Sequence, residues 1–547
     1  MNVNKIEMPM NNVGTLADVH SPVNQETLLK ATDINDFQSI KLSEINYSYG
    51  TLGKYDDVGF LFSSGFGLSG YNPSELWGNA QMSSALIENY LPGKVGADPE
   101  DPQNVIYVVR SSDPPFGNSW QRWNDAVLLG ADFYDGDKDG IYNPVDKNWN
   151  DIWDPTEDMP DLLGDETTWC VYNDGQPGNE RLRFAGVEPQ GIEIQQTLFA
   201  SSLPEFEDII FIRYKINNRG TVAEVLDSVI FGFMSDPDIG RHMDDLVGCD
   251  TLLSSGVCYN DGEDELYGIN PPAFYTTLLQ GPIIESQNPT DFAYDRKGIL
   301  IGANEFAGYK NQDIISTVNF VSSDPTIGDP NDHNEMRYYM KGLNRIGNKL
   351  DPCNHNWGEV RGGVDCSKVN PLYWYSGDPV EDIGWIMRVP TDIREMLSVG
   401  EFTLEKDKPV TIIGAYILGR GTDHLNSITV ARENVRRAIL EYESNFASLT
   451  YDPGEPVYPI DNYVLYHNYP NPFNPTTTIR YELPQDGIVT IKLYDILGQE
   501  VATILNEYKK VDRYEVIFNA VGLASGVYIY RMKVNDFITS KKMIILR

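Results

Sequence analysis

The residues best suited to chemistry in this sequence are the carboxylates between positions 132 and 165, where eleven Asp or Glu residues face two Lys. Such a density repels itself unless cations compensate it. The segment opens with the D-x-D-x-D-G spacing of a calcium-binding loop, and calcium takes about six to eight oxygen ligands. The predicted ligands are Asp135, Asp137 and Asp139, the backbone carbonyl of Ile141, Asn143 and Asp146.

A second loop repeats the first with an offset of eleven residues. Tyr142 corresponds to Trp153, and Pro144 to Pro155. The repeat departs at Asp151, which replaces Gly140 at a position whose backbone conformation glycine tolerates more readily. We expect calcium in both loops; the alternative is a solvated acidic turn without metal. The predicted ligands of the second loop are Asp146, shared with the first, and Asn148, Asn150, Ile152, Asp154 and Glu157.

These loops resemble those of dockerins and thrombospondin type 3 repeats more than a sensor EF-hand pair, because Pro144 and Pro155 discourage flanking helices. Millimolar external calcium can fill weak sites permanently. The resemblance therefore implies that calcium fixes a long loop and does not signal. Five tryptophans lie around this segment, and we expect them to pack the loop, with glycan stacking as the alternative: Trp120, Trp123, Trp149, Trp153 and Trp169.

A second acidic cluster surrounds His242 and has no calcium register. Paired carboxylates in different environments perform acid and base catalysis in glycosidases, so a carboxylate-dependent hydrolase is one hypothesis. The Asp-Pro and Ile-Gly pairs favour turns, in which carboxylates cap backbone amides or make another calcium contact. Signatures of serine, zinc and phosphate chemistry are absent from the sequence. The candidate catalytic residues are Asp236, Asp238, Asp244 and Asp245, with Asp250 at the end of the cluster.

Strands must position most of these residues. Runs of β-branched and aromatic residues at 208–218, 226–236 and 408–419 are bounded by turn residues and predict a mainly β fold, a large β-sandwich with long loops. One late helix, with Asn426 or Ser427 as its N-cap, is expected to close this body. Glycines 65, 67 and 70 form a G-x-G-x-x-G pattern without a βαβ unit, so we expect turns and not a nucleotide site.

Composition limits the partners. The chain has 42 basic and 80 acidic residues and a net charge of −38, which disfavours nucleic acid, and it has no apolar run long enough to span a membrane. Two local disulfides, Cys249–Cys258 and Cys353–Cys366, are one hypothesis, with Cys170 left alone; buried thiols are the other. The N-terminus has no secretory signal, so we expect that a leader has already been removed.

Charge and composition divide the chain into a body at 1–455, a linker at 456–461 and a C-terminal module at 462–547, and the stretch 451–461 around the boundary is rich in Pro, Gly and acidic residues. The module carries ten basic and eight acidic residues, whereas the remaining chain has a net charge of −40. Its segments alternate with period two, and about seven short strands predict a small immunoglobulin-like β-sandwich.

Three motifs of this module occur in a fixed order. They are NYPNPFNP at 468–475, YDILGQEV at 494–501, and LASGVY at 523–528 followed by Lys541, Lys542 and Met543. With them the module resembles the type A C-terminal sorting domain of the type IX (Por) secretion system. The prolines of the first motif fix φ and lack a donor, so this stretch should be an extended lead-in and not a central strand.

The resemblance implies that the translocon reads residues 462–547, and that a sortase then removes the module and attaches the cargo to lipopolysaccharide. The body also resembles uncharacterised cargo proteins of that system, in phrases such as GDETTWCVYNDG and IREMLSVGEFTL. We therefore expect a calcium-stabilised structural or adhesive protein outside the cell or on the outer-membrane surface, with a glycan or a second copy of the chain as partner classes. The alternative is an extracellular carbohydrate-active hydrolase or glycan-binding protein.

Overall fold

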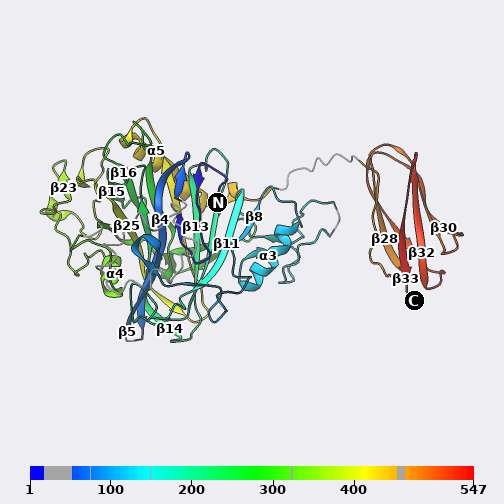
Figure 1. Ribbon diagram of the computed structural model, residues 1–547, viewed down its shortest axis with the longest axis horizontal. Helices are drawn as coiled ribbons and strands as arrows, with labels where there is room; N and C mark the ends of the chain where they lie inside the picture. Colours follow the sequence, from blue (N-terminus) through cyan, green and yellow to red (C-terminus); the bar gives the residue numbers. More distant parts are fainter. Residues whose placement is uncertain (18–51, 74, 148–149, 322–323, 453–461, 547) are drawn as a thin grey trace, which may run out of the picture. The chain divides into compact units, whose positions relative to one another are not determined.

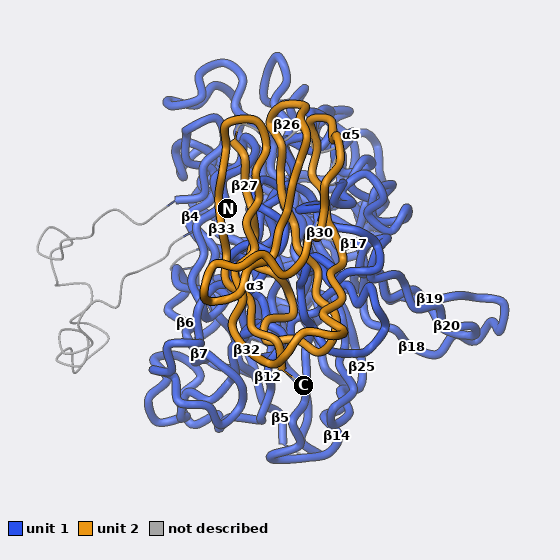
Figure 2. The backbone as a smooth tube through the Cα atoms, turned by 90° about the vertical axis from the view of Figure 1, so that its right-hand side faces the viewer, with its two compact units in different colours: residues 1–453 blue, residues 454–547 orange. Residues whose placement is uncertain are grey.

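A computed structural model describes residues 1–17, 52–73, 75–147, 150–321, 324–452 and 462–546. The chain forms two compact units, Met1–Pro453 and Gly454–Arg547, which Figure 2 colours separately. The predicted linker at 456–461 lies outside the described residues. Within the described ranges, we find no helix with the length and apolarity needed to cross a membrane.

The described strands of the larger unit form two nine-stranded sheets, whose arrangement can be followed in Figure 1. The first has the main order β1-β3-β4-β14-β25-β22, and the neighbouring strands are antiparallel. Its strands are β1 (Ile6–Glu7), β2 (Leu16–Ala17), β3 (Gly53–Tyr55), β4 (Val58–Asn72), β5 (Glu75–Met82), β6 (Ile87–Glu88), β14 (Val225–Pro237), β22 (Ile314–Val321) and β25 (Ile393–Glu405).

The second sheet has the order β15-β16-β17-β26-β13-β12-β11-β7, with β8 paired to β11. Its strands are β7 (Leu91–Pro92), β8 (Tyr107–Arg110), β11 (Glu166–Asn173), β12 (Ile192–Ala200), β13 (Ile209–Asn218), β15 (Asp245–Asp250), β16 (Ser255–Asn260), β17 (Ala273–Gln280) and β26 (Val410–Gly419). Two-stranded pairs extend the loops: β9 (Phe133–Tyr134) with β10 (Met159–Pro160), β18 (Ile283–Glu285) with β21 (Tyr309–Asn311), β19 (Phe292–Arg296) with β20 (Ala303–Ala307), and β23 (Gly358–Arg361) with β24 (Gly384–Met387).

The two sheets enclose one apolar core. Phe66 of β4 stacks on Phe231 of β14 and also contacts Tyr172 and Tyr214 of the opposite sheet. Strands β11, β12 and β13 are buried along almost their whole length, so both of their faces are covered. The predicted strands at 208–218, 226–236 and 408–419 are confirmed as β13, β14 and β26. The mainly β sandwich predicted from the sequence is confirmed.

Three α-helices lie within the described residues: α3 (Asn118–Leu129), α4 (His333–Met340) and α5 (His424–Glu443). Helix α5 is the predicted late helix and packs on β26 and β17, whereas α4 packs on β5 and β25 of the other sheet. The predicted N-cap of α5 is wrong: the side chain of Asp423 accepts a hydrogen bond from the backbone N–H of Asn426. Helix α3 was not predicted, because Gly117 at its N-cap provides no capping side chain.

The expectation that Gly65, Gly67 and Gly70 form turns is wrong, because all three lie inside β4. They allow close packing: a Cβ at Gly65 would lie 1.8 Å from the carbonyl oxygen of Gln81 on β5, and one at Gly70 would lie 2.8 Å from the Trp77 ring. Glycine in a strand interior often marks such an approach of neighbouring backbone.

The smaller unit contains seven strands in two sheets, β27-β28-β31 and β30-β29-β32-β33. Alternating burial along β28 and β29 builds an apolar core of its own that includes Ile479, Ile491 and Tyr530. The predicted small β domain is confirmed, and its immunoglobulin-like topology stays a prediction. The strands are β27 (Val464–Leu465), β28 (Thr476–Leu483), β29 (Gly487–Tyr494), β30 (Glu500–Lys509), β31 (Asp512–Asn519), β32 (Gly526–Val534) and β33 (Phe537–Ile545).

Candidate metal centre

The first acidic loop brings three carboxylates together. One oxygen from each of Asp135, Asp137 and Asp139 lies within 4.8 Å of the others. The backbone shapes this arrangement, because Asp135 accepts hydrogen bonds from the N–H groups of Asp139 (3.2 Å) and Gly140 (2.9 Å). Asp139 in turn accepts one from Ile141 N–H (2.7 Å). Asp137 Oδ1 also accepts from Asp139 N–H (3.2 Å), so the backbone amides hold the carboxylates together in the way that ligands of a hard cation require.

The second loop repeats the hydrogen bonds of the first with the predicted offset of eleven residues. Asp146 accepts from the N–H groups of Asn150 (3.2 Å) and Asp151 (2.8 Å), and Asn150 accepts from Ile152 N–H (2.9 Å). Asp151 has a φ of +58° where Gly140 has +78°. The aspartate therefore adopts the left-handed conformation that its place in the repeat requires. Asn148 lies outside the described residues.

The side chain of Lys147 already compensates part of the negative charge of the first loop. The Lys147 ammonium lies 2.6 Å from Asp137 Oδ2, and this hydrogen bond lowers the pKa of the Asp137 carboxyl. Lys147 also donates to the carbonyl oxygen of Thr156, 3.0 Å away. A cation entering the loop would therefore compete with a partly exposed ion pair, and such pairs contribute little stability.

The two loops sit on an aromatic cluster that anchors them to the second sheet. The ring centroids of Tyr142 and Phe133 are 5.2 Å apart, and those of Trp153 and Tyr134 are 5.5 Å apart. Equivalent aromatic residues of the two loops therefore make equivalent contacts with the core. Tyr142 also donates its hydroxyl proton to the carbonyl oxygen of Trp120. Four tryptophans are at most 4 % exposed, as the packing interpretation expects, and none presents a ring to a glycan: Trp120, Trp123, Trp153 and Trp169. Trp149 lies outside the described residues.

Two adjacent carboxylates close the base of both loops. Glu157 was predicted as the last ligand of the second loop, and its carboxylate accepts from the N–H groups of Lys147 (2.5 Å) and Asp154 (2.9 Å). Asp158 was not predicted; it accepts from Gly136 (3.0 Å) and Asn143 (2.8 Å). Burial raises the pKa of both carboxyls. Asp158 lies outside the loop pattern, so spacing alone did not identify it.

The structure divides the second acidic cluster. Oxygens of Asp236, Asp238 and Asp392 lie within 4.8 Å of one another, and Asp392 was missed because it is distant in sequence. Asp244 instead accepts from the Asn260 amide, and Asp250 forms an ion pair with Arg432 near the other end of β15.

Electrostatics in this cluster oppose ionisation. Burial raises the pKa of Asp236, against the opposing effect of Arg394, whose Nε lies 3.0 Å from Asp236 Oδ2. Burial, and then the charges of Asp236 and Asp392, raise the pKa of Asp238. Asp245 is fully buried, and this burial raises its pKa well above the usual value. These carboxylates are too crowded to be two separated glycosidase carboxyls, which stand about 5 Å or more apart.

Two of the cysteines form a predicted disulfide, and the other three are buried thiols. Cys353 and Cys366 form the predicted disulfide. Cys249 and Cys258 do not: they are buried thiols on β15 and β16, where Cys249 pairs with Gly256 and Cys258 with Val247, so their side chains are not opposite each other. Cys249 donates to the Thr317 hydroxyl. Cys170 is also a buried thiol.

The first C-terminal motif contacts the last strand. Strand β28 begins after the motif, at Thr476, so the expectation that this stretch is not a central strand is confirmed. It is fastened at both ends: the N–H of Asn468 donates to the Tyr530 hydroxyl, and Phe473 exchanges backbone hydrogen bonds with Ile544 and Leu546. The second motif is a turn in which Asp495 accepts from the N–H groups of Leu497 and Gln499.

Comparison with known proteins identifies this unit. Residues 467–546 match the family of secretion system C-terminal sorting domains. No curated protein matches the chain. A solved polysaccharide lyase is similar over 64 % of this chain and 34 % of its own length, with 7 % identity and a TM-score of 0.17. The chain thus spans about a third of that structure, and so low a TM-score supports no conclusion about fold or activity.

Proposed function

We infer that the sorting domain at residues 467–546 directs this protein through type IX secretion to the extracellular space or the outer-membrane surface. We propose that the exported cargo is a structural or adhesive protein whose long acidic loop is fixed by calcium. The loop ligands would be those predicted from the sequence between Asp135 and Glu157. Outside the cell, calcium is abundant enough to fill weak sites of this kind.

The repeated geometry of the two loops is the observation that carries the proposal. Two segments with different side chains make the same hydrogen bonds eleven residues apart, and Asp151 adopts a positive φ to do so. A solvated acidic turn has no reason to repeat this conformation. The loops also rest on a buried aromatic cluster, so a bound ion would stabilise the edge of the main sandwich near β8 and β11.

The tryptophans and the crowded carboxylates favour a structural role over glycan binding or hydrolysis. The four described tryptophans near the loop are buried. Asp236, a buried catalytic candidate, is paired with Arg394. A hydrolase would need a carboxyl pair open to a sugar, and a glycan binder an exposed aromatic face.

Calcium titration of the full chain by calorimetry tests the metal part of the proposal. The wild type is compared with Asp137→Asn in the first loop, Asp154→Asn in the second, and Asp101→Asn as an exposed control outside the loops. Each loop variant should bind one ion fewer than the wild type and lose part of the rise in melting temperature that calcium causes, whereas the control should match the wild type. Unchanged binding in both loop variants would contradict the proposal.

Self-association and cell binding of the Asp236→Asn variant test the adhesive part. We expect sedimentation and attachment to cells to be the same as for the wild type, because a surface function does not use this buried carboxylate. Polysaccharide cleavage by the wild type that disappears in Asp236→Asn would instead establish the hydrolase alternative.

A further inference from the structure

A second oxygen-rich site lies in the first sheet, where the end of strand β14 meets the start of strand β25. Strand β14 pairs antiparallel with β25, with Ser235 opposite Glu395. The end of β14 therefore meets the start of β25, and Asp236 and Asp238 come together with Asp392, although more than 150 residues separate them in sequence. The backbone keeps these ends in place, since Asp238 N–H donates to Phe60 O (2.9 Å) and Thr391 N–H to Asp245 O (3.1 Å).

The site carries more negative than positive charge. Arg394 contacts Asp236, but its Nη1 also lies 3.3 Å from Asp329 Oδ1, so one guanidinium serves two carboxylates. Asp238 and Asp392 add two further carboxylates to the cluster. Asp245 is a further carboxyl group beside Asp238 and is fully buried. Burying an excess of like charge without a counter-ion is costly.

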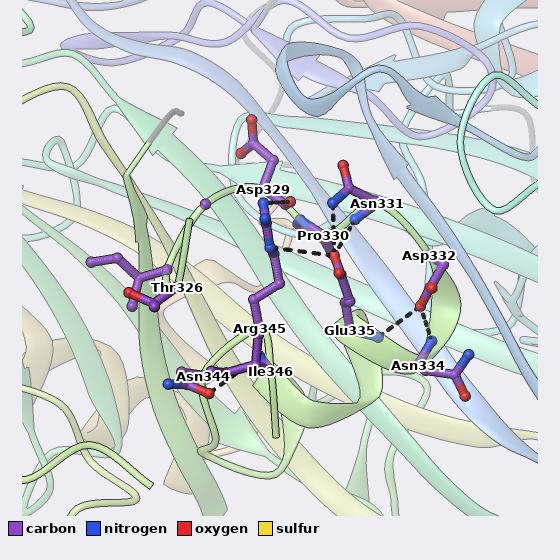
Figure 3. Close-up of polar contacts among 12 residues, drawn as sticks. Thr326, Asp329, Pro330, Asn331, Asp332, Asn334, Glu335, Asn344, Arg345 and Ile346 are labelled. Atoms are coloured by element: carbon purple, nitrogen blue, oxygen red, sulfur yellow. Dashed lines mark hydrogen bonds and ion pairs between the residues drawn. The ribbon is translucent and has the colours of Figure 1, made fainter. Parts of the chain in front are cut away.

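Other arginines near the site are held by the neighbouring loop. Figure 3 shows Arg345 pointing along this loop, with its Nη1 3.4 Å from the carbonyl oxygen of Asp329 and its Nε 3.6 Å from Glu335. Glu335 in turn accepts from Asn331 N–H at 2.7 Å. Arg183 donates to the carbonyl oxygen of Pro330. These contacts hold Arg345 on the loop, and within the described ranges it forms no ion pair with Asp238 or Asp392.

Two buried oxygens of this region lack a hydrogen-bond partner among the described residues. Asp236 is 2 % exposed, and its Oδ2 faces Arg394 while its Oδ1 has no partner. The Ser84 hydroxyl favours the charged form of Asp236 but does not reach hydrogen-bonding geometry with Oδ1. Asp245 Oδ1 is likewise unpartnered, whereas its Oδ2 accepts from Ile239 N–H. Buried polar atoms normally have partners, so each unpaired oxygen calls for a ligand.

We propose that Asp236, Asp238 and Asp392 bind a calcium ion that joins the end of β14 to the start of β25. Carboxylate oxygens of several residues are ligands that calcium prefers, and backbone carbonyls or water complete its shell. The half-buried side chains of Asp238 and Asp392 give an ion access from solvent. This site is independent of the proposed loop sites, because it shares no residue with them.

The test uses the full chain and calcium alone as the probe, in calorimetry and in melting with calcium or chelator. The background variant carries Asp137→Asn and Asp154→Asn, which removes the proposed loop sites. To it we add Asp392→Asn or Asp238→Asn, and Asp244→Asn as a matched control from the same acidic segment. The background and the control should still bind one ion and melt at a higher temperature with calcium; both test variants should do neither.

These measurements distinguish failure of the buried-site proposal from failure of the loop proposal and from unfolding of a variant. Absence of calcium binding in the background variant overturns the buried site while leaving the loop proposal intact, and unchanged binding in Asp392→Asn and Asp238→Asn also overturns it. Removing one carboxylate relieves repulsion, so in chelator each test variant should melt at or above the temperature of the background variant. A test variant that folds by circular dichroism and still gains stability from calcium contradicts the proposal.

Discussion

Glu395 is a buried carboxylate outside the proposed metal sites. It lies on β25, where its Oε1 accepts from the Thr276 hydroxyl at 2.7 Å while its Oε2 is unpartnered among the described residues. The groups that influence it across the core are the thiols of Cys249 and Cys258 and the hydroxyl of Tyr416, which are neutral at pH 7. Burial raises the pKa of Glu395 from 4.5 to about 7.

The Glu395→Gln substitution should stabilise the protein at pH 8. The folded state holds the proton more tightly than the unfolded state, so this group reduces the free energy of unfolding as pH rises from 4.5 to about 7. Glutamine keeps the acceptor for Thr276 and removes the charge. We expect a gain of up to about 3 kcal/mol at pH 8 that vanishes near pH 4.5, measured by urea unfolding of the larger unit.

Glu401 on the same strand supplies a control of opposite sign. Lys341 at 2.9 Å and Arg337 at 3.1 Å outweigh the effect of burial and lower the pKa of this carboxyl. Its contribution is present above the unfolded pKa and disappears as pH falls, so Glu401→Gln should destabilise the protein at pH 8 and have less effect at acidic pH. A gain for Glu395→Gln that does not change with pH would contradict the assignment.

Gly140 and Asp151 permit a paired test of the loop conformation. A Cβ at Gly140 would meet nothing within 4 Å, so Gly140→Ala changes little except the cost of a positive φ. That cost, about 1 kcal/mol, should weaken calcium binding at the first loop about fivefold, whereas Asp151→Gly should strengthen it at the second. Calorimetry measures both, with Gly262→Ala as a control at another open position. Equal affinities in all variants would contradict the repeat.

At this scale, sequence spacing can relate residues within one short segment but not residues that are distant in sequence. The repeat led us to expect a backbone conformation at Asp151 that glycine tolerates more readily, and the φ of +58° agrees with this expectation. Asp392 could not be predicted, because only the pairing of β14 with β25 brings it to Asp238. Asp158 was missed for a different reason: it binds backbone amides of the first loop from outside its pattern.

At the scale of elements, Asp158 fastens the first loop to the chain that follows the second. Its two oxygens accept from the N–H groups of Gly136 and Asn143. In Asp158→Asn, an amide NH₂ would face one of these donors and leave it unpaired, at a cost of about 1–3 kcal/mol. Hydrogen exchange should therefore accelerate at Gly136 or Asn143. The control Asp98→Asn, in an exposed turn with a single acceptor contact, should leave exchange in the loop unchanged.

Elements with period-two or continuous apolar patterns, such as β13 and β26, were predicted from the sequence because both faces are buried between covering layers. Strand β4 was mistaken for turns, since its glycines serve the approach of β5 and do not interrupt the strand. Helix α3 was not predicted, because its N-cap residue, Gly117, has no side chain that could signal a cap. In these cases tertiary packing, which a local pattern cannot show, decides the conformation.

For the whole molecule, the sorting domain and the proposed calcium sites belong to different units. Removal of residues 462–547 should abolish release by a host with the type IX machinery, whereas the full chain with Asp137→Asn should be exported like the wild type. Immunoblots of culture supernatant and cells measure both outcomes. Release of the truncated chain at wild-type levels would show that another segment directs export.

The three buried thiols imply that folding and disulfide formation occur in a particular order during maturation. In the native protein one pair of cysteines is oxidised, and Cys170, Cys249 and Cys258 are shielded by the sandwich. A chain that met an oxidant before the sandwich closed would offer all five sulfurs to wrong pairings. We therefore expect correct oxidation to depend on timing: closure of the sheets comes first, and Cys353 and Cys366, on a loop outside them, are left as the pair within reach.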